Sequence, residues 1–186
     1  MSAKNILVFS GSTRNGSVNT KLAAAAHKAA VDAGAQSTLI NLQDYPAAIY
    51  NGDDEAANGV PQPMRKLKQL MAQHDGFIVV TPEYNGHVPP LLVNTFSWLS
   101  RKEGDNDVSA FAGSKAAIMA ASPGRLGGVR VIPRLRDMLA ELGVTVVPGF
   151  VTLPGAMQAF EDNGNLKEQS NATAVSGQVE RLLQAL

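Results

Sequence analysis

The sequence predicts an α/β fold in which a five-stranded parallel sheet lies between two layers of helices. Two observations support this prediction: short apolar runs recur along the chain, and segments with helical spacing of apolar residues separate them. Short continuous apolar runs are typical of strands that are buried on both faces of a parallel sheet. Strands that alternate with helices indicate right-handed crossovers that cover both faces of such a sheet.

Four apolar runs are predicted to be buried strands, and a fifth run, which alternates more, is predicted to be an edge strand. The buried runs are Asn5–Ser10, Gly76–Thr81, Lys115–Ala121 and Val144–Phe150, and the edge run is Gln36–Leu42. Helices are predicted at Ser17–Ala33, Pro61–Gln73, Pro90–Arg101, Leu126–Leu142 and Asn165–Leu186. Proline is tolerated at the first position of a helix, and a glycine such as Gly34 commonly follows the last. Five strands in this alternation favour the flavodoxin-like strand order 2-1-3-4-5.

Composition narrows the classes of protein to consider. A chain of 186 residues suits one domain, here residues 1–186, with a substantial core. Lys and Arg together number 16, as do Asp and Glu, so the zero net charge gives no electrostatic reason to expect nucleic acid or an anionic membrane as a partner. Cysteine is absent, which excludes thiol nucleophiles and thiolate metal sites and fits a reducing compartment. No run approaches the ~18 apolar residues of a membrane span, and the first apolar run is too short for a signal peptide, so we expect a cytoplasmic protein.

Ligands of such sheets bind outside the carboxyl ends of the strands, near the point where the strand order reverses. Three loops are predicted to meet there: Gly11–Asn19, Pro82–Pro90 and Ser122–Arg130. All three are rich in Gly, Pro, Asn, Ser or Arg. They are therefore the candidate binding loops.

The loop Gly11–Asn19 has the composition of an anion site at the start of a helix. Free backbone amides and the helix dipole favour an anion there, and Arg14 adds a permanent positive charge. Gly11 and Gly16 have the spacing of a nucleoside triphosphate loop, but Ser17 and Val18 replace its Lys and its Ser or Thr. The glycine triplet of a dinucleotide site is also missing. A terminal monophosphate such as that of FMN suits the hydroxyl-rich loop, and an ordinary strand–helix turn remains the alternative.

The other two loops carry further candidates. Pro82 to Pro90 is a rigid segment that can present backbone groups to the edge of a flat ring, while Tyr84 either stacks on the ring or packs against the body. For Glu83 we expect a structural or interface role rather than acid–base catalysis. In the third loop, glycines at 124, 127 and 128 indicate close approach of the backbone to a ligand or to another chain. Arg125 and Arg130 either meet the phosphates of an incoming nucleotide or are solvated.

No metal site and no catalytic nucleophile are expected. His27, His74 and His87 are far apart in the sequence, and the acidic residues 53–55 form a small turn without the spacing of a calcium loop. The segment Ser10-Gly11-Ser12 comes nearest to a nucleophile elbow but lacks its flanking glycines.

With these loops placed, the chain resembles the NADPH-dependent FMN reductase family of flavodoxin-like quinone, chromate and azo-dye reductases. The matching segments are "GSTRNGSVN", "TPEYNGHVPPLLVN" and "SPGRLGGVR", and the tail "LPGAMQAFEDNGNL" is also similar. The resemblance covers nearly the whole chain, and the combination of the first two segments is more specific than either alone. The family's usual Leu-Lys-Asn-Ala is Leu92-Val93-Asn94-Thr95 here, and its Asp-Trp is Ser97-Trp98. These departures remove charges from a helix that is a candidate subunit interface.

The resemblance implies a set of flavin-binding residues and no catalytic acid or base. The FMN phosphate would be held by Ser12, Arg14, Ser17, Asn19 and the amide of Val18. The edge of the isoalloxazine ring would be lined by Pro82, Glu83, Tyr84, Asn85 and Gly86. The other side of the flavin would be closed by Ser122 and Gly124.

The resemblance also implies the reaction. NADPH or NADH would pass a hydride to FMN and leave, and a quinone, free flavin, chromate or azo dye would then take two electrons in the same place, in a ping-pong sequence. A homodimer or homotetramer is expected. Two other classes stay open: a flavodoxin-type electron carrier, which the balanced charge disfavours, and a regulatory protein that keeps the fold without the flavin.

Overall fold

The computed structural model describes residues 3–104, 107 and 109–186. Its strands are β1 (Asn5–Ser10), β2 (Gln36–Ile40), β3 (Gly76–Thr81), β4 (Lys115–Ala121), β5 (Thr145–Val146) and β6 (Val151–Leu153). All of the pairings are parallel, the order is β2-β1-β3-β4-β5, and β6 pairs with β4. The predicted fold class and strand order are confirmed. The expected single domain covered residues 1–186, of which 1, 2, 105, 106 and 108 lie outside the described part.

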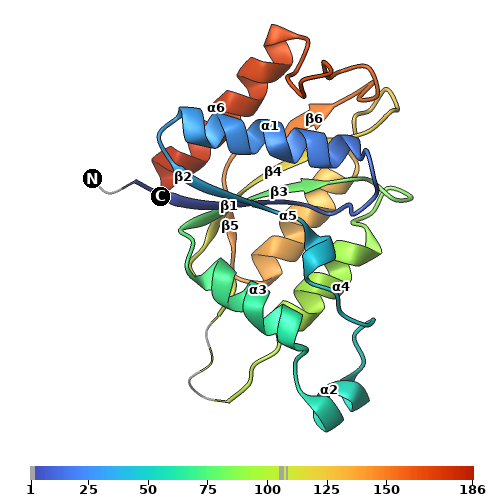
Figure 1. Cartoon of the computed structure of the whole chain (residues 1–186), viewed down its shortest axis with the longest axis vertical. Helices are drawn as coiled ribbons and strands as arrows, with labels where there is room; N and C mark the ends of the chain where they lie inside the picture. The colour runs from blue at the N-terminus through green and yellow to red at the C-terminus, as the bar shows by residue number, and fades with distance from the viewer. Residues whose placement is uncertain (1–2, 105–106, 108) are drawn as a thin grey trace.

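Alternating side chains of the central strands build a core on each face of the sheet. Ile6 and Val8 of β1 belong to the core on one face, and Leu7 and Phe9 belong to the core on the other. The first core is covered by α1 (Val18–Asp32) and α6 (Gln169–Ala185), and the second by α3 (Gln62–Ala72), α4 (Pro90–Leu99) and α5 (Val131–Glu141). Figure 1 shows these two helical layers above and below the sheet. Both faces are apolar, which explains why the strands read as continuous apolar runs.

The predicted strand Val144–Phe150 is wrong in its extent. Pairing with the start of β4 stops after the two residues of β5, and it resumes at Val151 of β6 beside Met119. Pro148 has no N–H to donate, and Gly149 has a φ of +82°, so the chain leaves the ladder between the two short strands. The edge beside β4 is therefore made of two pieces.

Helix α2 (Gly52–Asn58) replaces the predicted acidic turn at residues 53–55. The side chain of Asn51 caps it by accepting a hydrogen bond from the Asp53 amide at 2.9 Å, and its acidic first turn suits the helix dipole. None of its residues is buried, so it has no apolar stripe. Figure 1 shows α2 at the tip of the molecule that is farthest from the sheet. A short 3₁₀ turn, η1 (Leu42–Asp44), precedes it.

Two other helices start later than predicted. Helix α5 begins at Val131 rather than Leu126, because Gly127 and Gly128 have φ values of +60° and +85° that a right-handed helix does not allow. Helix α6 begins at Gln169 rather than Asn165. Among the residues that the structure describes, no helix is long and apolar enough to cross a membrane.

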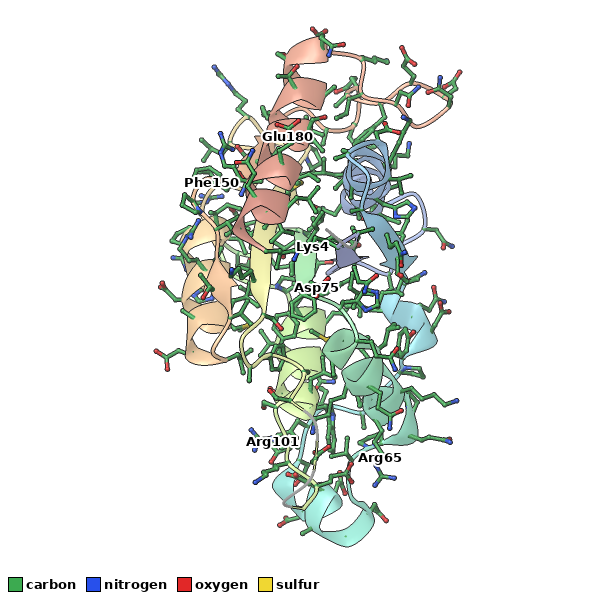
Figure 2. All side chains as sticks on the ribbon, turned by 90° about the vertical axis from the view of Figure 1, so that its left-hand side faces the viewer. Lys4, Arg65, Asp75, Arg101, Phe150 and Glu180 are labelled. Carbon is green, nitrogen blue, oxygen red and sulfur yellow. The ribbon has the colours of Figure 1, made fainter. Side chains whose placement is uncertain are left out.

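The lower end of the molecule, toward α2, is held by ion pairs and ring contacts. Arg65 of α3 binds Glu103 through Nη2–Oε1 at 2.6 Å and Nε–Oε2 at 2.7 Å, and the buried Lys68 pairs with Asp107. The guanidinium of Arg101 lies 5.1 Å from the ring centroid of Tyr50. Figure 2 shows Arg65 and Arg101 at this end.

Polar groups at the amino ends of the strands are paired with backbone. Lys4 Nζ donates to the carbonyl oxygen of Leu186 at 2.8 Å, and Lys115 Nζ donates to that of Ala185. The Asp75 carboxylate accepts from the Asn5 amide at 2.8 Å, and the Asp75 amide donates to the Asn5 carbonyl at 2.9 Å. Figure 2 looks onto this end of the sheet, with Lys4 and Asp75 next to each other.

Candidate functional site

The first loop turns the chain from β1 into α1 within a few residues. Ser17 caps the helix, since its Oγ accepts from the amides of Asn19 at 3.2 Å and Thr20 at 3.5 Å. A Cβ on Gly11 would lie 2.6 Å from Cδ1 of Leu92, so only glycine lets α4 approach this closely. The loop is therefore fixed by its cap and by packing against α4.

Hydrogen-bond donors of this loop are left without a protein partner. Within the described residues, the backbone amides of Ser12, Thr13, Asn15, Gly16 and Val18 donate no hydrogen bond, and the side chain of Arg14 makes no hydrogen bond or ion pair. A hollow of about 200 Å³ is lined by the loop together with Lys21 of α1 and residues 41 and 43 beyond β2. Free amides, a helix N-terminus and a guanidinium around one hollow suit an anion.

Asn19 makes two hydrogen bonds to the end of β4. Its side chain is buried, its Oδ1 accepts from the Ala121 amide at 2.9 Å, and its Nδ2 donates to the Ala121 carbonyl at 3.0 Å. These bonds join the start of α1 to the end of β4. Asn19 therefore positions the first loop against the third.

Ser10 is a residue of this region that the sequence reasoning did not select. Its side chain is 5% exposed, and its Oγ is the buried side-chain polar atom without a hydrogen-bond partner in the described part of the chain. The sequence does contain a signal for it, because a serine ends an otherwise apolar strand one residue before the loop. Buried polar groups without partners are rare in folded proteins.

The second loop folds back on itself beyond β3. Tyr84 and His87 exchange backbone hydrogen bonds of 3.0 and 2.9 Å, and Asn85 and Gly86 between them have φ values of +53° and +77°. Two successive positive φ values define a type I′ turn, which Asn-Gly favours. Tyr84 is 51% exposed, so about half of its surface is free to meet a ligand or a partner.

Glu83 and Arg130 join the second loop to the third. The Arg130 side chain donates to Glu83 Oε1, with Nη2 at 2.6 Å and Nε at 2.8 Å, and the Arg130 amide donates to Oε2 at 3.0 Å. The side chain of Glu83 is 8% exposed. Because both carboxylate oxygens are occupied, Glu83 is built as a structural link, as expected, and Arg130 is not solvated alone.

Two glycines of the third loop differ in what a side chain at their position would meet. A Cβ on Gly127 would lie 2.8 Å from the nitrogen of Pro154 and 2.9 Å from the carbonyl carbon of Leu153. Gly124 differs, since a Cβ there would meet only the Oγ of Ser122 at 3.5 Å. The same Oγ accepts from the Gly124 amide at 3.1 Å. Gly127 therefore serves the fold, and Ser122 and Gly124 remain candidates for a ligand.

Known proteins match this arrangement of loops. The model of the family described as NADPH-dependent FMN reductase matches residues 4–158, which include all three loops. The chain belongs to the NADPH-dependent FMN reductase family. It is 31% identical to a quinone reductase of Escherichia coli over 94% of this chain and 90% of that protein. It is 30% identical to an NAD(P)H-dependent FMN reductase of Pseudomonas aeruginosa over 95% and 92% of the two chains.

A solved structure agrees with this membership. FerB, a flavoenzyme NAD(P)H:(acceptor) oxidoreductase from Paracoccus denitrificans, superposes with a TM-score of 0.78 and 26% identity, covering 98% of each chain. The predicted family is confirmed by these comparisons.

The site meets the demands of FMN, the cofactor of NADPH-dependent FMN reductases, on observations of this chain alone. The free amides and the cation of Arg14 are donors around the hollow, which suits a phosphate that can only accept. A larger hollow of about 550 Å³ lies between α1, α6 and residues 161–169, and none of the predicted site residues lines it. In the described part of the chain, no group of His, Cys, Asp or Glu could hold a metal ion.

Proposed function

We propose that this chain is an FMN-dependent oxidoreductase that takes reducing equivalents from NAD(P)H and delivers them to a quinone-type acceptor. The observation that carries the proposal is the set of donors at the start of α1 that no protein group satisfies. The family match and the quinone reductase relative support the choice of cofactor and acceptor.

The first loop would hold the phosphate. Ser12, Arg14, Ser17 and the amide of Val18 face the same helix start and offer hydroxyl, guanidinium and backbone donors. Asn19 would act indirectly, by positioning the loop that holds the phosphate. Its carboxamide is hydrogen bonded to Ala121 and fixes the distance between the first and third loops.

The second and third loops would hold the ring. Pro82, Asn85 and Gly86 would offer backbone groups at the rim of the site, and Tyr84 would cover part of it. Ser122 and Gly124 would close the opposite side. Glu83 would keep the two loops together through Arg130. FMN, when bound, accepts two electrons as a hydride and releases them to the second substrate.

We also infer a homodimer or homotetramer. Tyr84, Leu126 and Met157 are apolar or aromatic, are each more than half exposed, and lie in segments that follow β3, β4 and β6. Apolar surface of this kind is covered by a partner in many assemblies. Light scattering coupled to size exclusion tests this, and a monomer at micromolar concentration would contradict it.

The proposal is tested by spectrum and by steady-state kinetics. The purified chain, incubated with FMN and desalted, should show flavin absorption in the visible range. It should oxidise NADH or NADPH in the presence of a quinone without any added protein, with parallel lines in double-reciprocal plots. A colourless sample would overturn the flavin site, and turnover that needs an added reductase would instead identify an electron carrier.

A further inference from the structure

We propose that Asn15 in the first loop is a site of spontaneous deamidation and that bound FMN protects it. Asparagine is a chemically labile residue, because the backbone nitrogen of the next residue can attack its side-chain amide. Gly16 follows Asn15, and glycine hinders this attack least, since it has no Cβ. The protection rests on the proposed function, because it assumes that the FMN phosphate binds in this loop.

The sequence contains five Asn-Gly pairs, and the structure separates them. The asparagine is exposed in every pair, at positions 15, 51, 58, 85 and 163. In two pairs the glycine nitrogen is engaged: the Gly59 amide donates to the Glu55 carbonyl at 2.7 Å, and the Gly164 amide donates to that of Glu161 at 3.0 Å. In a third pair, the side chain of Asn51 caps α2. Groups held in this way have to be released before they react.

The other two pairs lie in the candidate flavin loops. In the part of the chain that the structure describes, the asparagine side chains and the glycine amides of Asn15-Gly16 and Asn85-Gly86 make no hydrogen bond. The second-loop pair is enclosed by the two backbone hydrogen bonds between Tyr84 and His87, and Asn85 has a φ of +53°. Its turn is therefore held on both sides.

The first-loop pair is restrained least. Asn15 and Gly16 are both exposed, and one backbone hydrogen bond of 3.1 Å, from the Ser17 amide to the Arg14 carbonyl, closes the turn around them. The Gly16 nitrogen attacks Cγ of Asn15, the Cγ–Nδ2 bond breaks, and ammonia leaves with the proton of the Gly16 amide. Water then opens the succinimide ring to aspartate or isoaspartate. The reaction consumes only water.

The product places a negative charge in the anion site. Asn15 and Arg14 line the same hollow of about 200 Å³, beside the unpartnered amides of Gly16 and Val18. A carboxylate there is attracted by the donors and the helix dipole that suit a phosphate, and it repels the phosphate itself. Deamidation of the flavin-free chain therefore opposes its reloading with FMN. A bound phosphate would engage the Gly16 amide and prevent the attack.

The experiment follows deamidation by peptide mass spectrometry while the wild-type chain is held at mildly alkaline pH with and without FMN. In the flavin-free chain, Asn15 should react faster than the internal controls Asn58 and Asn163, whose glycine amides are engaged. With FMN at about 100 times its dissociation constant, about one chain in a hundred is free, so the rate at Asn15 should fall about hundredfold. The rate at Asn58 should fall much less.

Two variants test the effect on binding, which quenching of flavin fluorescence measures. Asn15→Asp reproduces the charge of the product and should bind FMN roughly tenfold more weakly. The flavin-free Asn15→Asp protein should melt at the same temperature or higher, because a carboxylate is favourable at the start of α1. Asn15→Gln has a longer side chain that closes a ring more slowly. Ageing without flavin should lower the FMN affinity of the wild type, but not that of Asn15→Gln, each compared with its own fresh sample.

Each other outcome has a distinct meaning. Equal rates at Asn15 and Asn58 in the flavin-free chain overturn the modification site, and equal FMN affinities of Asn15→Asp and wild type overturn its effect on binding. If the wild-type chain binds no flavin, the proposed function fails, and the flavin-free rates still decide the modification of Asn15. Inorganic sulfate at matched ionic strength then tests the protection: a slower reaction at Asn15 supports an anion contact, and an unchanged rate removes it.

Discussion

The two ends of the sheet differ in how their polar groups are used. At the amino end, Lys115 donates to the carbonyl of Ala185, the last residue of α6, and Lys4 donates to that of Leu186, which follows it. Asp75 exchanges two hydrogen bonds with the backbone of Asn5. At the carboxyl end, the side chain of Arg14 and the hydroxyl of Ser10 have no hydrogen-bond partner in the described chain. The named polar groups at the amino end are hydrogen bonded within the protein, whereas the carboxyl end has donors that a ligand could satisfy.

This difference shows where the molecule gives up stability for binding. Buried or clustered donors without partners destabilise a free protein, and they are tolerated where a ligand satisfies them. Substitutions at the amino end should therefore change stability alone, and those in the first loop should change binding. The carboxyl end also contains purely structural positions, such as Gly127, where a substitution should lower stability.

Gly127→Ala should have the largest effect. Its Cβ would press on the backbone of Leu153 and Pro154 at less than 3 Å, and its φ of +60° disfavours alanine. Overpacking costs about 1–3 kcal/mol and a left-handed alanine about 1–2 kcal/mol, so we expect a loss of about 3 kcal/mol in the free energy of unfolding. Chemical denaturation measures it.

Gly86→Ala is the matched control for that substitution. It shares the positive φ, at +77°, but a Cβ there meets nothing within 4 Å. It should cost only about 1 kcal/mol. Equal losses for the two variants would mean that packing on Leu153 does not matter.

Arg14→Ala should weaken FMN binding by about tenfold to hundredfold, or about 1.5–3 kcal/mol, because it removes a charge-assisted donor. The free energy of unfolding of the flavin-free chain should change little, since Arg14 is exposed and has no partner in the described chain. Fluorescence titration gives the affinity. Lys28→Ala removes a positive charge from the exposed far part of the same helix and should leave FMN affinity unchanged. Unaltered affinity for Arg14→Ala would show that the guanidinium does not reach the phosphate.

Lys115→Met should lower the free energy of unfolding by about 1–2 kcal/mol without changing FMN affinity. The ammonium group hydrogen bonds to the Ala185 carbonyl at the negative end of the α6 dipole, while methionine keeps the length of the side chain. Thermal and chemical denaturation test the first part, and flavin titration tests the second. A change in FMN affinity would show that the amino end of the sheet also influences binding at the carboxyl end.

Glu103→Gln should have the smallest effect, and one that depends on pH. The hydrogen bond with the Arg65 guanidinium, helped by its charge, lowers the pKa of Glu103. A lowered folded-state pKa stabilises the protein above the ordinary Glu pKa of about 4.3, and this contribution is lost as the pH falls through the lowered value. The stability difference between wild type and Glu103→Gln should therefore shrink as the pH falls from about 5 through the lowered pKa of Glu103. A difference that grows on acidification would contradict the sign, and the exposed pair should contribute well under 1 kcal/mol.

The strands and the family could be predicted because their signals are local. Apolar runs define β1, β3 and β4 to the residue, and the loop segments carry the family resemblance in single stretches of sequence. Local signals failed where the apolar pattern was misleading: residues 144–150 are apolar, but Pro148 and Gly149 interrupt the ladder. Helix α2 had a usable signal in its cap Asn51 and acidic first turn, but it has no apolar face.

The partners of the site residues could not be predicted because they are distant in the sequence. Asn19 bonds to Ala121, 102 residues away, and Glu83 bonds to Arg130, 47 residues away. A motif assigns such residues to the ligand, while the three-dimensional contact shows that their polar atoms also join two loops. The unpartnered hydroxyl of Ser10 is the reverse case, because only the fold reveals that nothing satisfies it.

The carboxamide of Asn19 continues the hydrogen bonding of β4 beyond the end of β3. β3 ends at Thr81, opposite Ala120, so the amide of Ala121 lies one residue beyond the last backbone pairing on that side. Its exchange with deuterated solvent should be as slow as that of a central strand only while the first turn of α1 is closed. The exchange rate of the Ala121 amide proton would therefore report how often the contact between the first and third loops opens. This rate can be compared with and without flavin.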